Sequence, residues 1–363
     1  MEKLFLLDAY ALIYRAYYAF IKAPRINSKG FNTSAILGFV NTLEDVLKKE
    51  EPTHIGVAFD PAGPTFRHEA YEQYKAQREA TPEAIKLSVP IIKDIIRAYH
   101  MPILEVPGYE ADDVIGTLAL QAGEQKIRTY MMTPDKDYGQ LVTDNVFMYR
   151  PKHTGGFEVM GIEEVKAKFD IQSPAQVIDM LGLMGDASDN IPGCPGVGEK
   201  TAQKLIAEFG SIENLLEHTD QLKGALKTKV ETNKELITFS KFLATIKIDV
   251  PIQLEMDKLV REQADEDSLR QIFEELEFRT LIDRVLKKEN SAGGVTMTTG
   301  SKTATAKSAP SPLPLFPEEG GAIQGDLFAN FTGNEAGEAK KSNLETLETL
   351  NCDYQLIDTE DKR

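Results

Sequence analysis

The stretch KLFLLDAY, residues 3–10, opens with an apolar, strand-like run that ends in an aspartate, Asp8. Two later stretches repeat this pattern: HIGVAFDP (54–61) leads to Asp60, and IRTYMMTPDKD (127–137) leads to Asp135 and Asp137. Such runs alternate with helix-like segments over residues 1–170, which predicts an α/β domain with a mostly parallel sheet. Ligands of open parallel sheets bind outside the carboxyl ends of the strands. We therefore expect these aspartates to meet at one edge of the sheet.

Further carboxylates are candidates for the same place. The cluster E-A-D-D supplies Glu110, Asp112 and Asp113, and the stretch GDASDN supplies Asp186 and Asp189. The 135/137 pair lies in a segment expected to be extended, and the 186/189 pair has the spacing of a helical turn, so each pair should face one way. Converging acids repel one another strongly unless cations neutralise them. Oxygen ligands without His or Cys fit Mg²⁺ or Mn²⁺ and not zinc, which predicts a metal-dependent phosphoryl-transfer site.

The composition is compatible with such a site. The 363 residues are enough for two domains with cores, and the formal net charge is −16. Much of that charge is the candidate site itself, so the acidic balance does not exclude DNA, which would be contacted through local basic patches and bound metal. Cys194 and Cys352 are too few for a disulfide framework. With no signal peptide and no apolar stretch near the roughly 20 residues of a membrane span, we expect a cytoplasmic protein without a membrane partner.

Helical patterns fill the space between and after the strands. An amphipathic helix is predicted over 35–47, and Phe66–His100 is mostly helical by pattern, with a break near Thr81-Pro82. Residues 171–290 are all-helical by pattern, and the last helix, Ser268–Lys287, has Asp267 as its expected cap. Residues 291–343 are rich in Gly, Ser, Thr, Ala and Pro, which is typical of a disordered linker. Residues 344–363 regain a strand signal, which indicates the start of a truncated further domain.

A glycine-rich stretch marks the helical part. IPGCPGVGEKTA (191–202) places Gly196 and Gly198 before Lys200 and Thr201 at a helix start. A Walker A loop is excluded, because it needs a lysine directly after the second glycine and a preceding strand. The pattern favours a helix–hairpin–helix turn, whose glycines let backbone N–H groups approach a DNA phosphate. The alternative is an ordinary helix connection that uses Gly and Pro as punctuation.

The stretch FRHEAYEQYKAQR, residues 66–78, is a third candidate for substrate contact. Tyr74, Lys75 and Arg78 combine a ring that could stack on a base with two phosphate-binding cations, which suits single-stranded nucleic acid. Arg15 lies in a tyrosine-rich stretch after Asp8 and has the same character. The alternative is a charged helix face that is simply exposed to solvent.

Together these stretches resemble the 5′-nuclease, flap endonuclease-like family, in particular the 5′→3′ exonuclease domains of the bacterial DNA polymerase I family. The likeness covers about residues 1–287 and rests on LLDAYALIYRAYYAF, FDPAGPTFRHEAYEQYKAQR, VPGYEADDVIGTLA, TPDKDYGQLV, GLMGDASDNIPGCPGVGEKTAQKL and ELEFRTL. It implies a PIN-like catalytic domain with a helical arch over 1–170 and a helix–three-turn–helix DNA-binding module over 171–290. A 3′–5′ exonuclease-like domain would then begin within 344–363.

The resemblance also implies an activity. The chain would be a monomeric 5′→3′ exonuclease and 5′-flap endonuclease that serves primer removal and repair within a bacterial polymerase. Its substrates would be DNA with a 5′ flap, a nick or a 5′ end, including RNA primers on DNA. Hydrolysis would use two divalent ions, and a K⁺ ion would be held by hairpin carbonyls.

Each candidate residue matches a position of the family. The first ion would be held by Asp8, Asp60, Glu110, Asp112 and Asp135, the second by Asp137, Asp186 and Asp189, and Asp113 falls on an outer acidic position. Lys75 and Arg78 match arch residues that engage the scissile phosphate, and Arg15 and Tyr74 match substrate-positioning residues. The chain departs from many relatives at Ala9-Tyr10 and at Cys194, and neither departure removes a metal ligand.

One motif lies in the predicted linker. QGDLF, with Gln324, Leu327 and Phe328, resembles the short peptide by which bacterial replication proteins dock on the sliding clamp. A peptide of this kind in a disordered segment is accessible and would fold on binding. The alternative is a chance Leu-Phe pair in low-complexity sequence.

Three other functions are alternatives to a 5′-nuclease. A single-strand-specific PIN ribonuclease would share the acids but lack the hairpin module. A haloacid-dehalogenase-type phosphatase would need its D-x-D after the first strand, whereas here it follows a later one. A non-catalytic DNA-binding module would be expected to have lost several acids, whereas all the acidic positions are filled.

Overall fold

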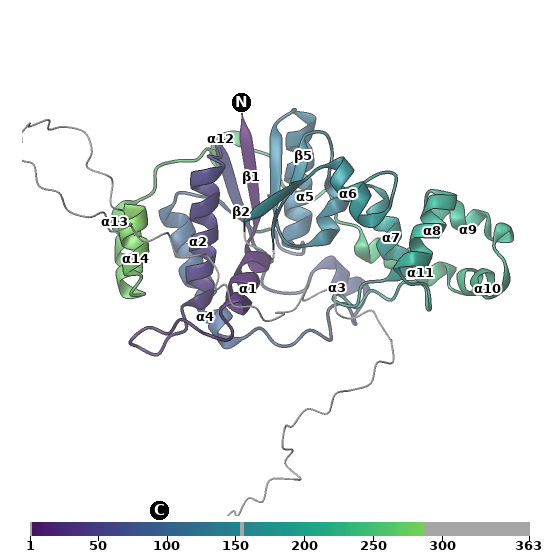
Figure 1. Cartoon of the computed structure of the whole chain (residues 1–363), viewed down its shortest axis with the longest axis horizontal. Coiled ribbons are helices and arrows are strands. Elements are labelled where there is room, and N and C mark those ends of the chain that lie inside the picture. Colours follow the sequence, from purple (N-terminus) through teal and green to yellow (C-terminus); the bar gives the residue numbers. More distant parts are fainter. Residues whose placement is uncertain (1, 153–155, 287–363) are drawn as a thin grey trace, which may run out of the picture.

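A six-stranded sheet forms the centre of the molecule in a computed structural model that describes residues 2–152 and 156–286 (Figure 1). The strands are β1 (Lys3–Asp8), β2 (His54–Ala58), β3 (Ile103–Leu104), β4 (Arg128–Met132), β5 (Val146–Pro151) and β6 (Phe157–Met160). Their order is β3-β2-β1-β4-β5-β6, and every neighbouring pair is parallel except β5–β6. The predicted α/β fold with a mostly parallel sheet is confirmed.

Strand β1 decides where ligands can bind. It pairs with β2 on one side and with β4 on the other, so that Leu7 lies opposite both Val57 and Met132. Its residues Leu4–Leu7 are fully buried, as expected for a strand covered on both faces. The strand order reverses between β1 and β4, and the carboxyl ends of the strands at such a reversal form the usual binding crevice of an open sheet.

Helices cover both faces of the sheet (Figure 1). On one side α1, α2 and α4 share a core with one face of β1 and β2, and on the other side α5 shares a second core. The elements of this part are α1 (Ala9–Ala19), α2 (Ser34–Lys49), α3 (Phe66–Ala70), α4 (Glu83–Ala98), α5 (Ala111–Glu124), the 3₁₀ helix η1 (Lys136–Leu141) and α6 (Ile162–Phe169).

The predicted all-helical part extends from one end of the sheet domain (Figure 1). It comprises α7 (Gln176–Met184), α8 (Glu199–Phe209), α9 (Ile212–Glu217), η2 (Thr219–Gln221), α10 (Gly224–Thr232) and α11 (Lys234–Ala244). The short helix α12 (Met256–Leu259), which was predicted with this part, lies instead beside the sheet (Figure 1), where Val260 forms a bridge with His54 of β2. Helices α7 and α11 pack closely, because a Cβ on Gly182 would lie only 3.0 Å from the Cα of Lys241. In the described part of the chain, no helix is long and apolar enough to cross a membrane.

The last helices differ from the prediction. The expected single helix, Ser268–Lys287, is divided into α13 (Glu266–Glu275), α14 (Arg279–Leu281) and the π-helix η3 (Ile282–Leu286). The break falls at Glu277, whose φ of 64° is left-handed. The N-cap is Asp265, which accepts from Ser268 N at 3.0 Å, and not the expected Asp267. These helices lie beside α2 and α4 (Figure 1), so they complete the core of the sheet domain, although they were predicted with the helical part.

The segment between α3 and α4 also differs. Helix α3 has only five residues, and residues 71–82 are turns and irregular backbone, so they form no continuous helical arch. Lys75 has a left-handed φ of 56°, and its N–H donates to Asp189 O at 3.0 Å. A helix through this segment would break that contact. The predicted linker (291–343) and following strand (344–363) lie outside the described residues.

Candidate active site

Asp8 lies at the reversal of strand order. It ends β1 and caps α1, where its Oδ1 accepts from Ala11 N at 3.1 Å. Its Oδ2 accepts from the hydroxyls of Thr133 and Tyr138, both at 3.1 Å. Burial, together with the charge of Asp60, raises the pKa of Asp8 to about 7. The side chain is thus held in one orientation in a place where a bound cation would favour its ionised form.

The start of α5 brings the E-A-D-D cluster to the same edge. Glu110 and Asp113 form a capping box, in which Glu110 N donates to Asp113 Oδ2 at 3.1 Å. Asp60 joins them, because its Oδ1 accepts from Ala111 N at 2.8 Å. Burial raises the pKa of Asp60, and burial together with the charge of Asp113 raises the pKa of Asp112 well above its usual range. The positive end of the α5 dipole favours negative charge here.

Asp113 is committed to contacts within the protein. It is fully buried, and the guanidinium of Arg67 binds both its oxygens, from Nη1 to Oδ2 at 2.9 Å and from Nη2 to Oδ1 at 2.8 Å. Lys247 N also donates to Oδ1, at 2.7 Å. Both oxygens are therefore occupied, and the outer position that the resemblance implied for Asp113 stays a prediction.

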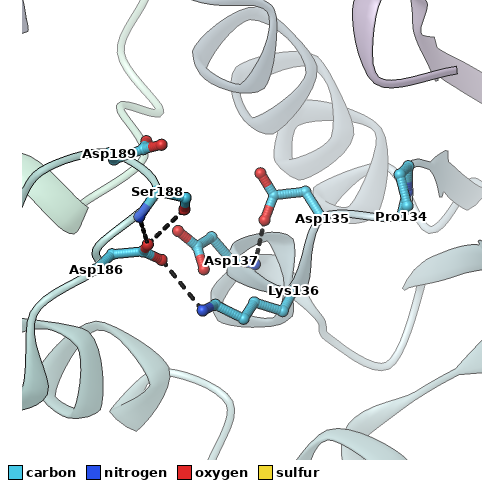
Figure 2. Close-up of a pocket in the computed structure, with 7 residues that line it drawn as sticks. All are labelled: Pro134, Asp135, Lys136, Asp137, Asp186, Ser188 and Asp189. Carbon is cyan, nitrogen blue, oxygen red and sulfur yellow. Dashed lines mark hydrogen bonds and ion pairs between the residues drawn. The ribbon is translucent and has the colours of Figure 1, made fainter. Parts of the chain in front are cut away.

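A second group of acids lines a small pocket between η1 and the turn after α7 (Figure 2). The pocket is lined by Pro134, Asp135, Lys136, Asp137, Asp186, Ser188 and Asp189. It encloses about 10 Å³, close to the space that one water molecule needs. Lys136 Nζ lies 3.1 Å from Asp186 Oδ2, and Ser188 N donates to Asp186 Oδ1 at 2.8 Å.

The local geometry of these two acidic pairs was predicted wrongly. Asp135 and Asp137 do not lie in an extended segment, because Asp135 caps the 3₁₀ helix η1 and accepts from Asp137 N at 2.9 Å. Asp186 and Asp189 lie in a turn closed by the bridge between Asp186 and Ile191, not on a helical turn. Both pairs nevertheless line the same pocket.

Two cations from the 71–82 segment enter the site. Lys75 Nζ lies 2.8 Å from Glu110 Oε1 and 3.6 Å from Asp189 Oδ2, and Arg78 is also paired with Asp189. Burial lowers the pKa of Lys75, but the charges of Asp189 and Glu110 outweigh burial and raise it. Burial likewise raises the pKa of Asp189, but Lys75 and Arg78 outweigh burial and lower it. These groups therefore stay charged near neutral pH.

Tyr74 does not offer a stacking surface as we predicted. It is only 3% exposed, and its hydroxyl oxygen lies 2.9 Å from Glu110 Oε2 and 3.1 Å from Asp189 Oδ2, so that its one proton is shared between the two carboxylates. It therefore joins the two acidic groups. Arg15, on α1, donates from Nη2 to Lys152 O at 3.3 Å.

The acids fit a hard divalent cation, although they are not arranged tightly around one. Within residues 2–152 and 156–286, no three acidic, histidine or cysteine side chains form a group ready to hold an ion. Lysine and arginine side chains pair with several of the acids instead. The fit is supported by Asp137 Oδ1, a buried oxygen with no hydrogen-bond partner among the described residues. Burial, together with Asp135 and Asp186, raises the pKa of Asp137 well above its usual range, so a cation would relieve this repulsion.

The hairpin residues gather at the start of α8. Gly198 caps this helix, and Lys200 and Thr201 lie in its first turn, so the predicted helix start at these two residues is confirmed. Gly196 has a φ of 74°, and its carbonyl accepts from Lys229 Nζ at 3.1 Å. Contact of these residues with phosphate, or of hairpin carbonyls with K⁺, stays a prediction.

Sequence reasoning missed several residues that hold the site. Arg67, Thr133, Tyr138 and Gln140 bind the acids or their backbone, and none was singled out. Arg67 was not singled out because the charged stretch around it is typical of a solvent-exposed helix. Thr133 and Tyr138 stand beside Asp135 and Asp137, so their proximity to the acidic motif was the available signal.

Comparison with known proteins identifies the family. A family model described as the N-terminal resolvase-like domain of 5′–3′ exonuclease matches residues 3–170, and one described as its C-terminal SAM fold matches residues 172–267. DNA polymerase I of Bacillus subtilis is 42% identical over 287 residues, which are 78% of this chain and 32% of that protein. DNA polymerase I of Mycobacterium tuberculosis is 35% identical over 348 residues, which are 95% of this chain and 37% of that protein. The chain thus spans about a third of the length of these relatives.

Solved structures share the fold. A bacteriophage T5 5′-exonuclease with bound divalent metal ions (zinc) is 20% identical with a TM-score of 0.57, over 76% of this chain and 99% of that one. The catalytic core of Rad2 in complex with DNA substrate is 18% identical with a TM-score of 0.53, over 78% of this chain and 92% of that one. On the two family models and these relatives, the chain belongs to the 5′–3′ exonuclease family.

Proposed function

We propose that this chain is the 5′-nuclease part of a bacterial DNA polymerase I, and that it hydrolyses DNA at 5′ flaps, nicks and 5′ ends with two divalent ions, Mg²⁺ or Mn²⁺. The observation that carries the proposal is the acidic site at the reversal of strand order, with the cations Lys75 and Arg78 beside it. Asp137 Oδ1, which has no hydrogen-bond partner among residues 2–152 and 156–286, belongs to the same site. Relatives named DNA polymerase I support the parent protein. The structural relatives include a T5 flap endonuclease in complex with DNA and metal ions.

Different residues of the site would bind the metal ions, supply positive charge and hold the carboxylates in place. One ion would be held by acids at the ends of β1 and β2 and the start of α5, and the other by Asp137, Asp186 and Asp189. When bound, such ions polarise the phosphodiester and lower the pKa of a water molecule. Lys75 and Arg78 supply fixed positive charge where a phosphate would enter. Tyr74, Thr133 and Tyr138 hold the carboxylates in place through hydroxyl hydrogen bonds.

The domain plan belongs to the same proposal. Residues 1–170 would carry the chemistry together with Asp186 and Asp189, and residues 171–290 would bind duplex backbone through Gly196, Gly198, Lys200 and Thr201. Arg15 would contact substrate from α1. A linker over 291–343 would lead to a further, 3′–5′ exonuclease-like domain that starts within 344–363.

A cleavage assay tests the proposed function. A DNA duplex with a 5′ flap, labelled at its 5′ end, is incubated with the full chain in Mg²⁺, in Mn²⁺ or in EDTA. We expect release of the flap in either metal and none in EDTA. A matched single-stranded RNA serves as the control, because a PIN ribonuclease would cut it. Metal-independent cleavage, or binding of the flap without cleavage in any metal, would contradict the proposal.

A second proposal concerns the segment with Gln324, Leu327 and Phe328, which lies outside the described residues. We infer that it docks on the sliding clamp. The double substitution Leu327→Ala/Phe328→Ala should lower affinity for purified clamp at least about tenfold, because apolar anchors carry most of the binding energy of short peptides. Unchanged clamp affinity in this variant would contradict the proposal. Flap cleavage in the absence of clamp, which should be unchanged, shows that the variant is folded.

A further inference from the structure

The last two residues of α11 and the three residues that follow it form a stretch, Leu243–Lys247, that we call the exit segment. Side chains of the sheet domain bind a backbone group of every residue in it. The hydrogen bonds run from Arg67 Nε to Leu243 O (3.0 Å), Gln140 Nε2 to Ala244 O (3.0 Å), Arg67 Nη2 to Thr245 O (2.8 Å), Ile246 N to Gln140 Oε1 (2.9 Å) and Lys247 N to Asp113 Oδ1 (2.7 Å). Bonds to consecutive backbone groups fix both the position and the rotation of a segment.

The same side chains belong to the acidic site. Arg67 Nη1 donates to Glu110 Oε2 at 3.0 Å, in addition to its two bonds to Asp113. Gln140 lies on η1, the 3₁₀ helix that carries Asp137, and its Nε2 also donates to Asp137 O at 3.0 Å. Arg67 therefore connects the exit segment to the α5 acids, and Gln140 connects it to the acids of the pocket.

Helix α11 reaches the hairpin at another point. Gly193 N donates to Ser240 Oγ at 2.9 Å, which ties the loop before α8 to the middle of α11. Gly193 has a φ of 62°, and a Cβ there would lie 2.3 Å from Gly185 N, so the loop passes very close to the end of α7. Helix α11 is thus bound to the hairpin at Ser240 and, three and four residues later, to the side chains of Arg67 and Gln140.

We propose that Gln140 and Arg67 are positioning residues that hold α11, and with it the hairpin, in fixed register against the carboxylates, so that the position of the cut along the DNA is set. This inference rests on the proposed function. Its physical basis is that a displacement of about 1 Å between a substrate-binding element and the reacting groups can cost about 100-fold in rate. Gln140 is the better residue to test, because its side chain does not touch a carboxylate in any of these bonds.

The chain offers a matched control for Gln140. Gln121, on α5, also clamps the backbone of a connecting segment, from Nε2 to Ile252 O at 3.1 Å and from Leu254 N to Oε1 at 2.8 Å. Both glutamines are half-buried. Methionine has a similar length and removes these hydrogen bonds in either case, so Gln140→Met and Gln121→Met should lose comparable stability.

The experiment measures where and how fast each full-length variant cuts. A 5′-flap duplex is cleaved under single-turnover conditions in Mg²⁺, the products are resolved to one nucleotide, and duplex affinity is measured in EDTA. For Gln140→Met we expect products spread over neighbouring positions and a rate about tenfold or more below wild type, with affinity changed less than twofold. Gln121→Met should cut at the wild-type position and rate.

Each outcome has a distinct meaning. If Gln140→Met cuts as sharply and as fast as Gln121→Met, the positioning role is wrong while the proposed function stands. If both variants scatter the products equally, the effect is general destabilisation and the inference is likewise overturned. If the wild type does not cut the flap at all, the proposed function fails, and the inference fails with it.

Discussion

Replacing Arg67 by methionine should lower the free energy of unfolding by about 3–5 kcal/mol, because removing one partner of a buried ion pair leaves the other charge uncompensated. The Arg67 side chain is 1% exposed, and it faces Asp113 and Glu110, which are 0% and 5% exposed. The carbonyls of Leu243 and Thr245 would lose their donors as well. Urea denaturation in EDTA measures the effect, which should shift the midpoint without changing the slope.

Two further variants separate the buried network from general effects. Arg97→Met removes an exposed pair with Asp94, whose side chains are 61% and 59% exposed, and should change stability by less than about 0.5 kcal/mol. The double variant Arg67→Met/Asp113→Asn should lose less unfolding free energy than the two single variants lose together, by at least about 1 kcal/mol. The reason is that it no longer buries an unpaired charge at Asp113. If Arg67→Met costs no more than Arg97→Met, the network does not stabilise the fold.

The sheet and its acids could be predicted because the signals are local. A fully buried parallel strand requires a continuous apolar run, and β1 shows such a run, Leu4–Leu7, directly before Asp8. The strand-end rule then brings distant aspartates together without any knowledge of loop structure. The local geometry around Asp137 and Asp189 could not be predicted from the sequence. Two acids spaced two residues apart occur in a strand and at a 3₁₀ cap alike, and a spacing of three occurs in a helix and in a turn alike.

Partners that are distant in sequence could not be predicted. Arg67 binds Asp113 and Leu243, which lie 46 and 176 residues away, and nothing near residue 67 marks it as buried. The same is true of Tyr74, whose ring was expected to face DNA and instead lies in the core beneath two carboxylates. In both cases the charged sequence around the residue predicts exposure, and the tertiary fold overrides that local pattern.

Replacing Asp137 by asparagine should stabilise the metal-free protein and reduce catalysis. Burial, with the charges of Asp135 and Asp186, raises the pKa of Asp137 well above its usual range, so the folded state keeps a proton that the unfolded state releases. The stability of the wild type therefore falls as the pH rises from about 4 through the folded-state pKa. Asparagine has no proton to lose. In EDTA we expect a gain of more than about 1 kcal/mol at pH 8 and almost none at pH 4, because one pKa unit corresponds to about 1.4 kcal/mol.

Divalent metal should make the wild type more stable than Asp137→Asn, which reverses the order of stability expected in EDTA. Mg²⁺ binding to the folded state raises the melting temperature by mass action, and the wild type should gain more than Asp137→Asn because the variant lacks one candidate ligand. Flap cleavage by the variant should fall at least about 100-fold. The exposed Asp144 gives a matched control, since Asp144→Asn should leave melting temperature and cleavage unchanged. Wild-type cleavage by Asp137→Asn would show that this carboxylate is not a metal ligand. The same pH dependence of stability in EDTA as the wild type would show that it is not the source of the charge repulsion.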